Sequence, residues 1–376
     1  MSRPVSPSAL SVEAARDQAP HAPGRRAALR GAGALLAGLG MPGALLAVGG
    51  SSRAEDSPAL RYAHSPKALR LAMLLARQTA LPLAWLRKQV ARAHYQPLVT
   101  RLILPGRPEQ KNWQVYRSHF LQTARIATGV RFARSFDSWL RAGQQRFGVP
   151  PEVVLGILGV ETIYGRSMGD FPVLDSLTTL SLDFPAAAPL DRSAYFRSQL
   201  GDYFVWCNAG GIDPASIRGS YAGAIGMPQF MPGSILRWGT RFDGEGAVDL
   251  IHSAPDAIAS IGHFLAGHGW VAGAPAWFQL QLPQHLNPTV LRELLAPDIV
   301  PTFRAWQLRA AGIALLPEAQ AYPGKLAVVQ LPNADAAPDY VLGTDNFFAL
   351  TRYNKSAFYA LAVLELGSRV LLEARG

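Results

Sequence analysis

The sequence predicts a mainly helical protein with a small β-containing lobe, an α+β arrangement. Three observations support this fold class. Apolar residues recur at three- and four-residue spacing from Ser65 to about Gly148, short strand-like segments gather between Trp277 and Thr351, and an apolar helical segment closes the chain at Ala357–Leu372. With 376 residues, the chain is long enough to bury a large core.

Several further helices are predicted within the helical part. Pro150-Pro151 predicts a helix start, because proline is well tolerated in a first turn. The other predicted helical stretches are Leu81–Leu86, Trp113–Ala127, Phe136–Phe147, Ala194–Ala209 and Asp256–Ala266.

The predicted β lobe covers about residues 277–351. Pro332, Pro338 and a Gly343-Thr344-Asp345 turn separate its short strands. These strands are predicted at Phe278–Leu282, Leu326–Leu331, Tyr340–Leu342 and Phe347–Thr351. No separate binding module fits after the final helix.

The N-terminus has the layout of a cleaved export signal. Arg25, Arg26 and Arg30 precede an uncharged run of mostly Ala, Leu and Gly at residues 31–50, and small residues follow at Ser52-Arg53-Ala54. The paired arginines resemble a twin-arginine signal. A plain leader rich in Ala and Gly is the alternative interpretation.

This layout predicts that residues 1–54 are removed near Ala54 and that residues 55–376 form one soluble domain in the periplasm. No cysteine follows the apolar run, so the protein is not predicted to be a lipoprotein.

Charge and cysteine content narrow the function classes. The formal net charge is +10, of which residues 1–54 contribute +4 and the remainder +6. A mildly basic body suits an anionic polymer. Since no run of Lys and Arg is interleaved with aromatic residues, nucleic acid is not the predicted partner. The single cysteine, Cys207, excludes an intramolecular disulfide and is interpreted as a small core residue.

One carboxylate lies on an apolar helical stripe. In PEVVLGILGVETIYG, Glu161 falls on the same helix face as Val154, Ile157 and Leu158. Burial of this kind raises the pKa of a carboxyl group. A carboxylic acid that stays protonated near neutral pH can donate a proton to a leaving glycosidic oxygen.

Gly156 and Gly159 lie inside the same predicted helix, where each costs about 1 kcal/mol relative to alanine. They predict a central helix that another backbone approaches closely. On the residue pattern alone, a partly buried Glu161 paired with an arginine remains the favoured interpretation.

Four motifs in order resemble one known family. They are GVETIYG (Gly159–Gly165), FPVLDSLTTLSLDFP (Phe171–Pro185), GSYAGAIGMPQFMPGS (Gly219–Ser234) and NFFALTRYNKS (Asn346–Ser356). Together they closely resemble the membrane-bound lytic transglycosylase B family, glycoside hydrolases with a lysozyme-like fold. The resemblance runs from about Ser65 to Leu372 and implies a lysozyme-like helical catalytic domain with the small β lobe.

The resemblance implies a peptidoglycan lytic transglycosylase. The family's catalytic acid is the Glu of the GVET motif, here Glu161, which protonates the oxygen between N-acetylmuramic acid and N-acetylglucosamine. It then acts as a base while the muramoyl C6 hydroxyl attacks C1, which leaves a 1,6-anhydromuramoyl end. The muramoyl N-acetyl group replaces a second carboxylate, although Asp170, Asp175 and Asp183 are near enough in sequence to be considered.

The resemblance also implies substrate contacts in the GSYAGAIGMPQFMPGS motif. Ser220 and Gln229 match polar residues near the reacting sugar, and an amide such as Gln229 offers both a donor and an acceptor. Ser220 capping a turn is the alternative. For Phe230, a position lining the groove and a position in the core are equally compatible with the sequence.

Other matching positions lie outside that motif. Tyr353 and Asn354 match a sugar-contacting pair, although Asn354 also fits a cap of the terminal helix. Tyr116 matches a cleft tyrosine, with a core role as the alternative. Arg192 matches the second of two adjacent arginines in relatives, and the first is Asp191 here, which puts a contact with substrate carboxylates in doubt.

Some family members carry an EF-hand-like calcium loop after the QFMP motif. Here the first ligand position is Arg241, where calcium requires an oxygen atom. Asp243, Glu245, the Ala247 carbonyl and Asp256 match the later positions. A plain polar turn is the favoured interpretation, and no metal ion or cofactor is predicted.

Two other functions compete with the transglycosylase. A lysozyme-type muramidase would release reducing ends, and a non-catalytic peptidoglycan-binding protein would need no proton donor. The predicted partner is the glycan strand of peptidoglycan. Other cell-wall enzymes are candidate partners, nucleic acid is not, and a monomer is the expected state.

Overall fold

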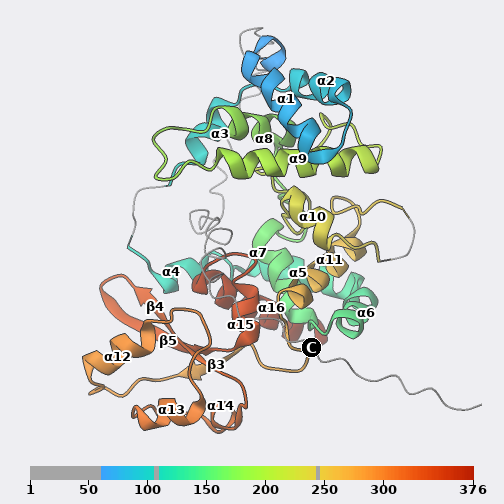
Figure 1. Ribbon diagram of the computed structural model, residues 1–376. Helices are drawn as coiled ribbons and strands as arrows, with labels where there is room; N and C mark the ends of the chain where they lie inside the picture. Colours follow the sequence, from blue (N-terminus) through green and yellow to red (C-terminus); the bar gives the residue numbers. More distant parts are fainter. Residues whose placement is uncertain (1–60, 106–109, 243–245) are drawn as a thin grey trace, which may run out of the picture. The chain divides into compact units, whose positions relative to one another are not determined.

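The computed structural model describes residues 61–105, 110–242 and 246–376 (Figure 1). The predicted leader, residues 1–54, lies outside these ranges. Among the described residues, no helix combines the length and the apolar character needed to span a membrane.

The described residues form sixteen α-helices and two small sheets, which confirms a mainly helical fold with a minor β component. In chain order the elements are η2 (Tyr62–His64), α1 (Pro66–Thr79), α2 (Leu83–Arg92), α3 (Pro97–Leu102), α4 (Trp113–Ser118), α5 (Thr123–Ser135), α6 (Asp137–Phe147), α7 (Pro151–Thr162), β1 (Phe171–Pro172), α8 (Val173–Leu182), α9 (Ser193–Ala209), β2 (Arg218–Gly219), α10 (Pro232–Trp238), α11 (Ala254–Gly267), β3 (Trp277–Leu280), α12 (Pro288–Leu295), α13 (Ala305–Ala310), α14 (Pro317–Ala321), β4 (Ala327–Asn333), β5 (Ala336–Gly343), α15 (Asp345–Leu350) and α16 (Ala357–Arg375).

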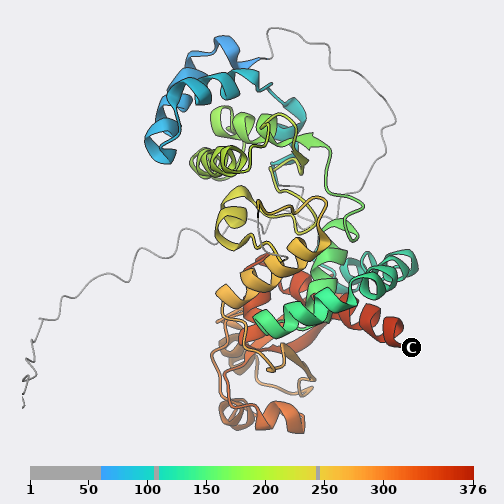
Figure 2. The ribbon, with the colours of Figure 1, turned by 90° about the vertical axis from the view of Figure 1, so that its right-hand side faces the viewer.

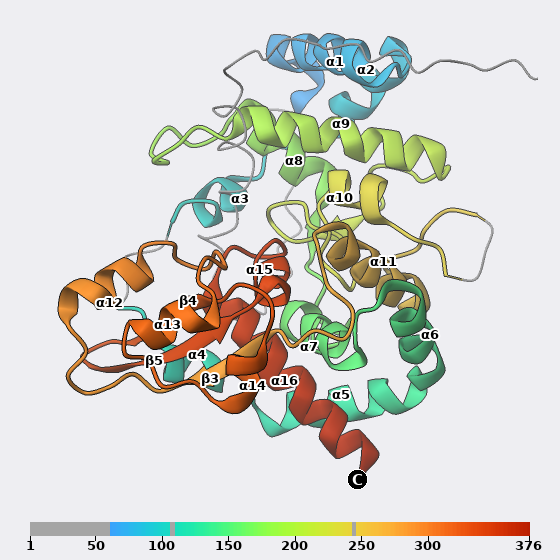
Figure 3. The same cartoon turned by 60° about the horizontal axis from the view of Figure 1, so that its bottom comes forward.

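The helix that carries Glu161, α7, packs along the terminal helix α16 inside the main hydrophobic core (Figure 3). A Cβ atom on Gly156 would collide with the Val363 carbonyl oxygen, and one on Gly367 would collide with the Glu152 carbonyl oxygen. The predicted close approach of a second backbone is therefore confirmed, and the approaching element is α16. Pro151 occupies the first turn of α7, as predicted.

Helices α1 and α2 pack against one another, and α1 also contacts α8 and α9 (Figure 2). Two aspartates join these helices. Asp183 accepts hydrogen bonds from the Tyr62 hydroxyl at 2.7 Å and from Lys67 at 2.8 Å. Asp175 accepts hydrogen bonds from the His94 backbone at 3.0 Å and from the Gln96 amide at 3.0 Å. Both carboxylates therefore have structural partners in the N-terminal helical segment.

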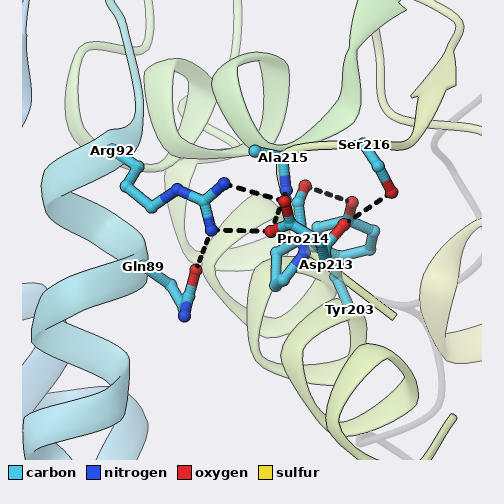
Figure 4. A network of polar contacts seen from close by, with 7 residues as sticks. All are labelled: Gln89, Arg92, Tyr203, Asp213, Pro214, Ala215 and Ser216. Atoms are coloured by element: carbon cyan, nitrogen blue, oxygen red, sulfur yellow. Dashed lines mark hydrogen bonds and ion pairs between the residues drawn. The ribbon is translucent and has the colours of Figure 1, made fainter. Parts of the chain in front are cut away.

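A further ion pair ties α2 to the turn after α9 (Figure 4). The two terminal nitrogens of Arg92 donate to the two carboxylate oxygens of Asp213, at 2.6 and 2.9 Å. Arg92 also donates to the Gln89 amide oxygen, and the Ala215 backbone N–H donates to Asp213. This bidentate geometry fixes the guanidinium plane.

The larger sheet is antiparallel with strand order β3-β5-β4. It packs on a second, smaller core with the short helices α12 to α14. The buried members of that core include Leu280, Leu294, Leu308, Leu326 and Leu342. Three of the four predicted strands thus correspond to observed strands, and the helices between them were not predicted.

The fourth predicted strand, Phe347–Thr351, is wrong because this segment belongs to helix α15. The Thr344 hydroxyl accepts a hydrogen bond from the Asn346 backbone N–H, which is the geometry of a helix N-cap. The Gly343-Thr344-Asp345 turn therefore begins a helix.

Candidate active site

Glu161 lies in the last turn of α7, directly before an unusual reversal of the chain. Ile163, Tyr164 and Gly165 all have positive φ angles, of 52°, 58° and 84°. Left-handed backbone is costly for a β-branched residue such as isoleucine, and such strain is often found at functional sites. The reversal is held by the Tyr164 backbone N–H, which donates to the Leu158 carbonyl at 3.0 Å.

The environment of Glu161 favours its protonated form. Burial raises the pKa of this half-buried carboxyl group to about 7, and a hydrogen bond from Tyr359 lowers it in part. The Tyr359 hydroxyl donates to Glu161 Oε1 at 2.6 Å. The carbonyl end of a helix also disfavours a negative charge in its last turn. Glu161 can therefore hold a proton near neutral pH and release it to a nearby oxygen.

Tyr359 was missed by sequence reasoning. It follows Ser356, whose hydroxyl caps α16 by accepting from the Tyr359 backbone N–H. The ring of Tyr359 is stacked on that of Tyr353, with centroids 6.2 Å apart and planes at 14°. The only sequence signal was its place one turn inside the terminal helix, which does not indicate what it faces.

Tyr353 contacts the GSYAGAIGMPQFMPGS loop from the segment before α16. It is buried, and its hydroxyl donates to the Pro228 carbonyl at 2.6 Å. On the other side, the Thr162 hydroxyl donates to the Met227 carbonyl at 2.8 Å. The loop is thus held between the end of α7 and the segment before α16. Burial and the charge of Glu161 raise the pKa of Tyr353.

Gln229 and Ser220 lie at the two ends of this loop. Gln229 has φ 51°, and its amide nitrogen donates to the carbonyls of Met168 and Gly226, both at 3.0 Å. The Ser220 hydroxyl accepts from the Ala224 backbone N–H at 3.0 Å, so its turn-capping role is present. Both side chains are half-buried.

Phe230 belongs to the core. Only 2% of its surface is exposed, and its ring contacts those of Phe264 and Tyr353, with centroids 5.5 and 5.8 Å away. The groove-lining interpretation of Phe230 is therefore wrong. Its ring packs against Tyr353 within the core.

Tyr116 is half-buried on α4, where its ring packs against Phe120 and Phe358. Burial and, next, the charge of Glu161 raise the pKa of Tyr116. Tyr116 is therefore near enough to Glu161 to feel its charge, as Tyr353 and Tyr359 are.

Asn354 does not cap the terminal helix, because Ser356 does. The Asn354 side-chain oxygen is buried and has no hydrogen-bond partner among the described residues. A buried polar atom without a partner costs free energy. This atom is therefore a candidate acceptor for a ligand N–H or O–H.

Arg192 lies at the start of α9, and its guanidinium packs over the rings of Tyr195 and Phe196 at 5.4 and 5.3 Å. Its Nε atom is buried without a partner among the described residues. Burial lowers the pKa of Arg192, and Tyr195 and Tyr221 act in the opposite direction. Tyr221 follows Ser220 in the chain, so Arg192 lies near the end of the loop that carries Ser220.

In the loop that resembles a calcium site, oxygen atoms at the described ligand positions already accept hydrogen bonds from the protein. Arg241 donates to the Ala247 carbonyl at 3.0 Å, the oxygen that would fill a calcium position. Asp256 is buried, and its two oxygens accept from the backbone N–H groups of Phe242 and Asp249. Asp243 and Glu245 lie outside the described residues. No cluster of three metal-ligating side chains occurs in the part of the chain that the structure describes.

The mainly helical fold and the half-buried carboxyl group of Glu161 are those expected of a transglycosylase. Residues 67–368 match the family described as the transglycosylase SLT domain, and the chain belongs to this family. Within it, the chain is a member of the lytic transglycosylase B group, enzymes that cleave peptidoglycan.

The comparisons with individual proteins agree. The chain is 34% identical over 264 residues to the membrane-bound lytic murein transglycosylase B of Escherichia coli, covering 69% of this chain and 68% of the relative. The Escherichia coli lytic transglycosylase Slt35 in complex with calcium is 30% identical, with a TM-score of 0.72 over 84% of this chain and 96% of the other. SltB3 of Pseudomonas aeruginosa in complex with NAG-NAM-pentapeptide is 25% identical, with a TM-score of 0.68 over 79% and 78%.

Proposed function

We propose that this enzyme cleaves the bond between N-acetylmuramic acid and N-acetylglucosamine in peptidoglycan with Glu161 as its single acid and base. The observation that supports this best is the place of Glu161, half-buried at the end of α7 with the Tyr359 hydroxyl at 2.6 Å, where burial raises its pKa to about 7. A proton donor is most effective when its pKa lies near the working pH.

In the first step, Glu161 donates its proton to the glycosidic oxygen as the bond to C1 breaks. The positive charge that develops on the sugar ring is stabilised by the substrate's own N-acetyl group. Glu161 is now a carboxylate, and the hydrogen bond from Tyr359 stabilises this charged form.

In the second step, the Glu161 carboxylate removes a proton from the muramoyl C6 hydroxyl, whose oxygen attacks C1. The product carries a 1,6-anhydromuramoyl end, the first proton leaves on the hydroxyl of the departing N-acetylglucosamine, and Glu161 is reprotonated by the proton of the C6 hydroxyl. No water molecule is consumed in the proposed reaction.

The partners of the neighbouring aspartates support a one-carboxylate mechanism. Asp175 and Asp183 accept hydrogen bonds from residues of the N-terminal helical segment, and Asp170 is exposed.

Four polar groups are proposed to hold the sugars. The Asn354 oxygen lacks a partner among the described residues, and the Gln229 oxygen remains available because its amide nitrogen makes the recorded contacts. Tyr116 and Ser220 present hydroxyl groups, near Glu161 and at the end of the loop respectively. Tyr353 acts mainly by supporting the loop, and Arg192 is proposed to meet substrate carboxylates.

Mass spectrometry of the products released from purified sacculi tests the proposal. Anhydromuramoyl ends are expected with the wild-type enzyme, and their absence in Glu161→Gln links them to this carboxyl group. Reducing ends would instead assign a lysozyme-type hydrolase. Binding to sacculi without any product would assign a non-catalytic wall-binding protein.

A further inference from the structure

The N-terminal helical segment has an exceptional charge distribution. Residues 61–105 contain eight Lys or Arg residues and no Asp or Glu. Two of these cations are neutralised by acids elsewhere, since Lys67 pairs with Asp183 and Arg92 with Asp213. Arg70, Arg77 and Arg87 are exposed and form no hydrogen bond or ion pair with another described residue.

The exposed face of α1 is also apolar. Its buried side consists of Ala68, Leu71, Ala72 and Leu75, as helical spacing requires. On the opposite side Leu69, Met73 and Leu74 expose 43%, 42% and 38% of their surface. Single exposed apolar residues are common, but here three lie on one face of a single helix.

Cations and apolar side chains alternate along this face. Leu69 and Met73 are four residues apart, as are Arg70 and Leu74, and Arg77 follows Met73 by four. The face therefore carries two parallel rows in which leucine or methionine neighbours arginine. We call residues 69, 70, 73, 74 and 77 the α1 face.

A groove of about 650 Å³ lies beside the α1 face, between α1 and α2. Leu69 lines it from α1, and Ala84, Arg87 and Lys88 line it from α2. Apolar residues and two cations thus line the groove together, so α2 carries the same combination of side chains as the α1 face.

We propose that the α1 face and this groove bind the surface of an anionic phospholipid membrane. The cations meet lipid phosphates, and Leu69, Met73 and Leu74 enter the boundary between headgroups and acyl chains. A peptidoglycan strand with its peptide carboxylates would satisfy the arginines but would leave the apolar row in water. The combination therefore favours a membrane, and the proposal is independent of the catalytic role of Glu161.

Cosedimentation of the full chain with lipid vesicles tests the proposal. One set of vesicles contains phosphatidylcholine alone and the other an equal mixture with phosphatidylglycerol. Binding is expected only to the anionic set and should weaken as salt is added.

Two double variants separate the contributions. Arg70→Gln with Arg77→Gln is expected to weaken binding about thirtyfold, because each basic residue near an anionic surface contributes about a fivefold factor. Leu69→Ser with Met73→Ser is expected to weaken it about tenfold through lost apolar burial. Cleavage of soluble glycan fragments should be unchanged in both.

Helix α13 offers a matched control on another part of the chain. Trp306, 68% exposed, and Arg309, also exposed, are changed to Ser and Gln together. This variant should bind vesicles as the wild type does. All variants share the same residues before α1, so any difference between them arises at the mutated helix. Unchanged vesicle binding by both α1 variants would overturn the proposal. A loss of binding to sacculi with vesicle binding intact would also overturn it and would identify the wall polymer as the partner.

Discussion

Glu161 and Tyr359 are joined by a hydrogen bond of 2.6 Å across 198 positions of the chain. The bond has two consequences for catalysis. It keeps the carboxyl group oriented, and it lowers a pKa that burial alone would raise further. Acid strength and position are thus set by the same contact.

Replacing Glu161 with glutamine keeps an oxygen that accepts from Tyr359 but removes the proton donor. Lysis of sacculi is expected to fall by roughly 10²–10⁴-fold or more, as for the loss of an acid catalyst. Loss of turbidity in a sacculus suspension measures it. Activity within about tenfold of wild type would exclude Glu161 as the acid.

The same variant also tests the pKa through stability. Between the ordinary value of 4.5 and about 7, folded Glu161 keeps a proton that the unfolded chain has released, so stability falls as pH rises through this window. Glu161→Gln avoids this loss and should be more stable than wild type at pH 8, by about 2–3 kcal/mol, with a smaller difference at pH 5. Denaturant unfolding at the two pH values measures the effect.

Changing Tyr359 to phenylalanine should move the alkaline limb of the activity profile to higher pH. The lost hydrogen bond had favoured the carboxylate, so the pKa of Glu161 rises without it. The rate at the optimum should fall about tenfold as the carboxyl group loses its orientation. Tyr353→Phe is the control, because that hydroxyl bonds Pro228 and leaves the limb in place. An alkaline limb that stays unmoved in Tyr359→Phe would refute the assigned role.

Only the family resemblance predicted Glu161 as the acid, whereas the sequence pattern predicted its place on an apolar helix face with Val154, Ile157 and Leu158. The pattern could not predict Tyr359, since Glu161 and Tyr359 meet only through the packing of α7 on α16. Phe230 shows a related limit. A phenylalanine in a Gly- and Pro-rich loop fits a groove or a core equally well, and its depth depends on Phe264 and Tyr353, which are distant in sequence.

At the scale of elements, the C-terminal end of α7 is stabilised by a side chain from α5. Arg125 on α5 donates to the Gly159 carbonyl at 2.8 Å, and its guanidinium packs over the Phe120 ring at 5.1 Å. The last carbonyls of a helix have no partner within the helix. Arg125 thereby stabilises the turn that carries Glu161.

Replacing Arg125 with methionine should destabilise the fold by about 1–2 kcal/mol, because it leaves the Gly159 carbonyl without its donor. It should also lower kcat more than it changes KM, since Glu161 loses its precise position. Steady-state kinetics and thermal unfolding measure both. Arg131→Met on the same helix is the control, as Arg131 is exposed and, among the residues that the structure describes, its side chain bonds only Thr128 of its own helix. Equal effects in the two variants would contradict the positioning role of Arg125.

The loop after α10 is expected to need no calcium. Arg241 already donates to the Ala247 carbonyl, and Asp256 already accepts two backbone hydrogen bonds. Treatment with a chelator should therefore leave both the activity and the Tm unchanged. A rise in Tm that saturates with added calcium would show that the ion binds.

At the scale of elements, periodicity predicted most of the long helices because their buried faces repeat along one segment, but the predicted stretch Trp113–Ala127 is divided between α4 and α5. The error at Phe347–Thr351 has a local cause. Five residues rich in apolar side chains satisfy both a short strand and a helix turn, and the Thr344 cap that decides between them is a single hydrogen bond.

For the whole molecule, export is the remaining prediction. Residues 1–54 are expected to be removed, so the mature protein should begin near Glu55 and be recovered from the periplasm. N-terminal sequencing measures this. If twin-arginine export operates, replacing Arg25 and Arg26 with Lys should retain the precursor in the cytoplasm, whereas normal processing would indicate the general secretory route. Full-length protein starting at Met1 in membranes would contradict cleavage.

The partnership between α7 and α16 has a consequence for the order of synthesis. A chain made from its N-terminus carries Glu161 long before α16 exists, and α16 is the last element of the described chain. Until that helix docks, Glu161 has neither Tyr359 nor the surroundings that raise its pKa. Lytic competence is therefore expected only after α16 has docked, so a C-terminally truncated chain that lacks α16 should be inactive.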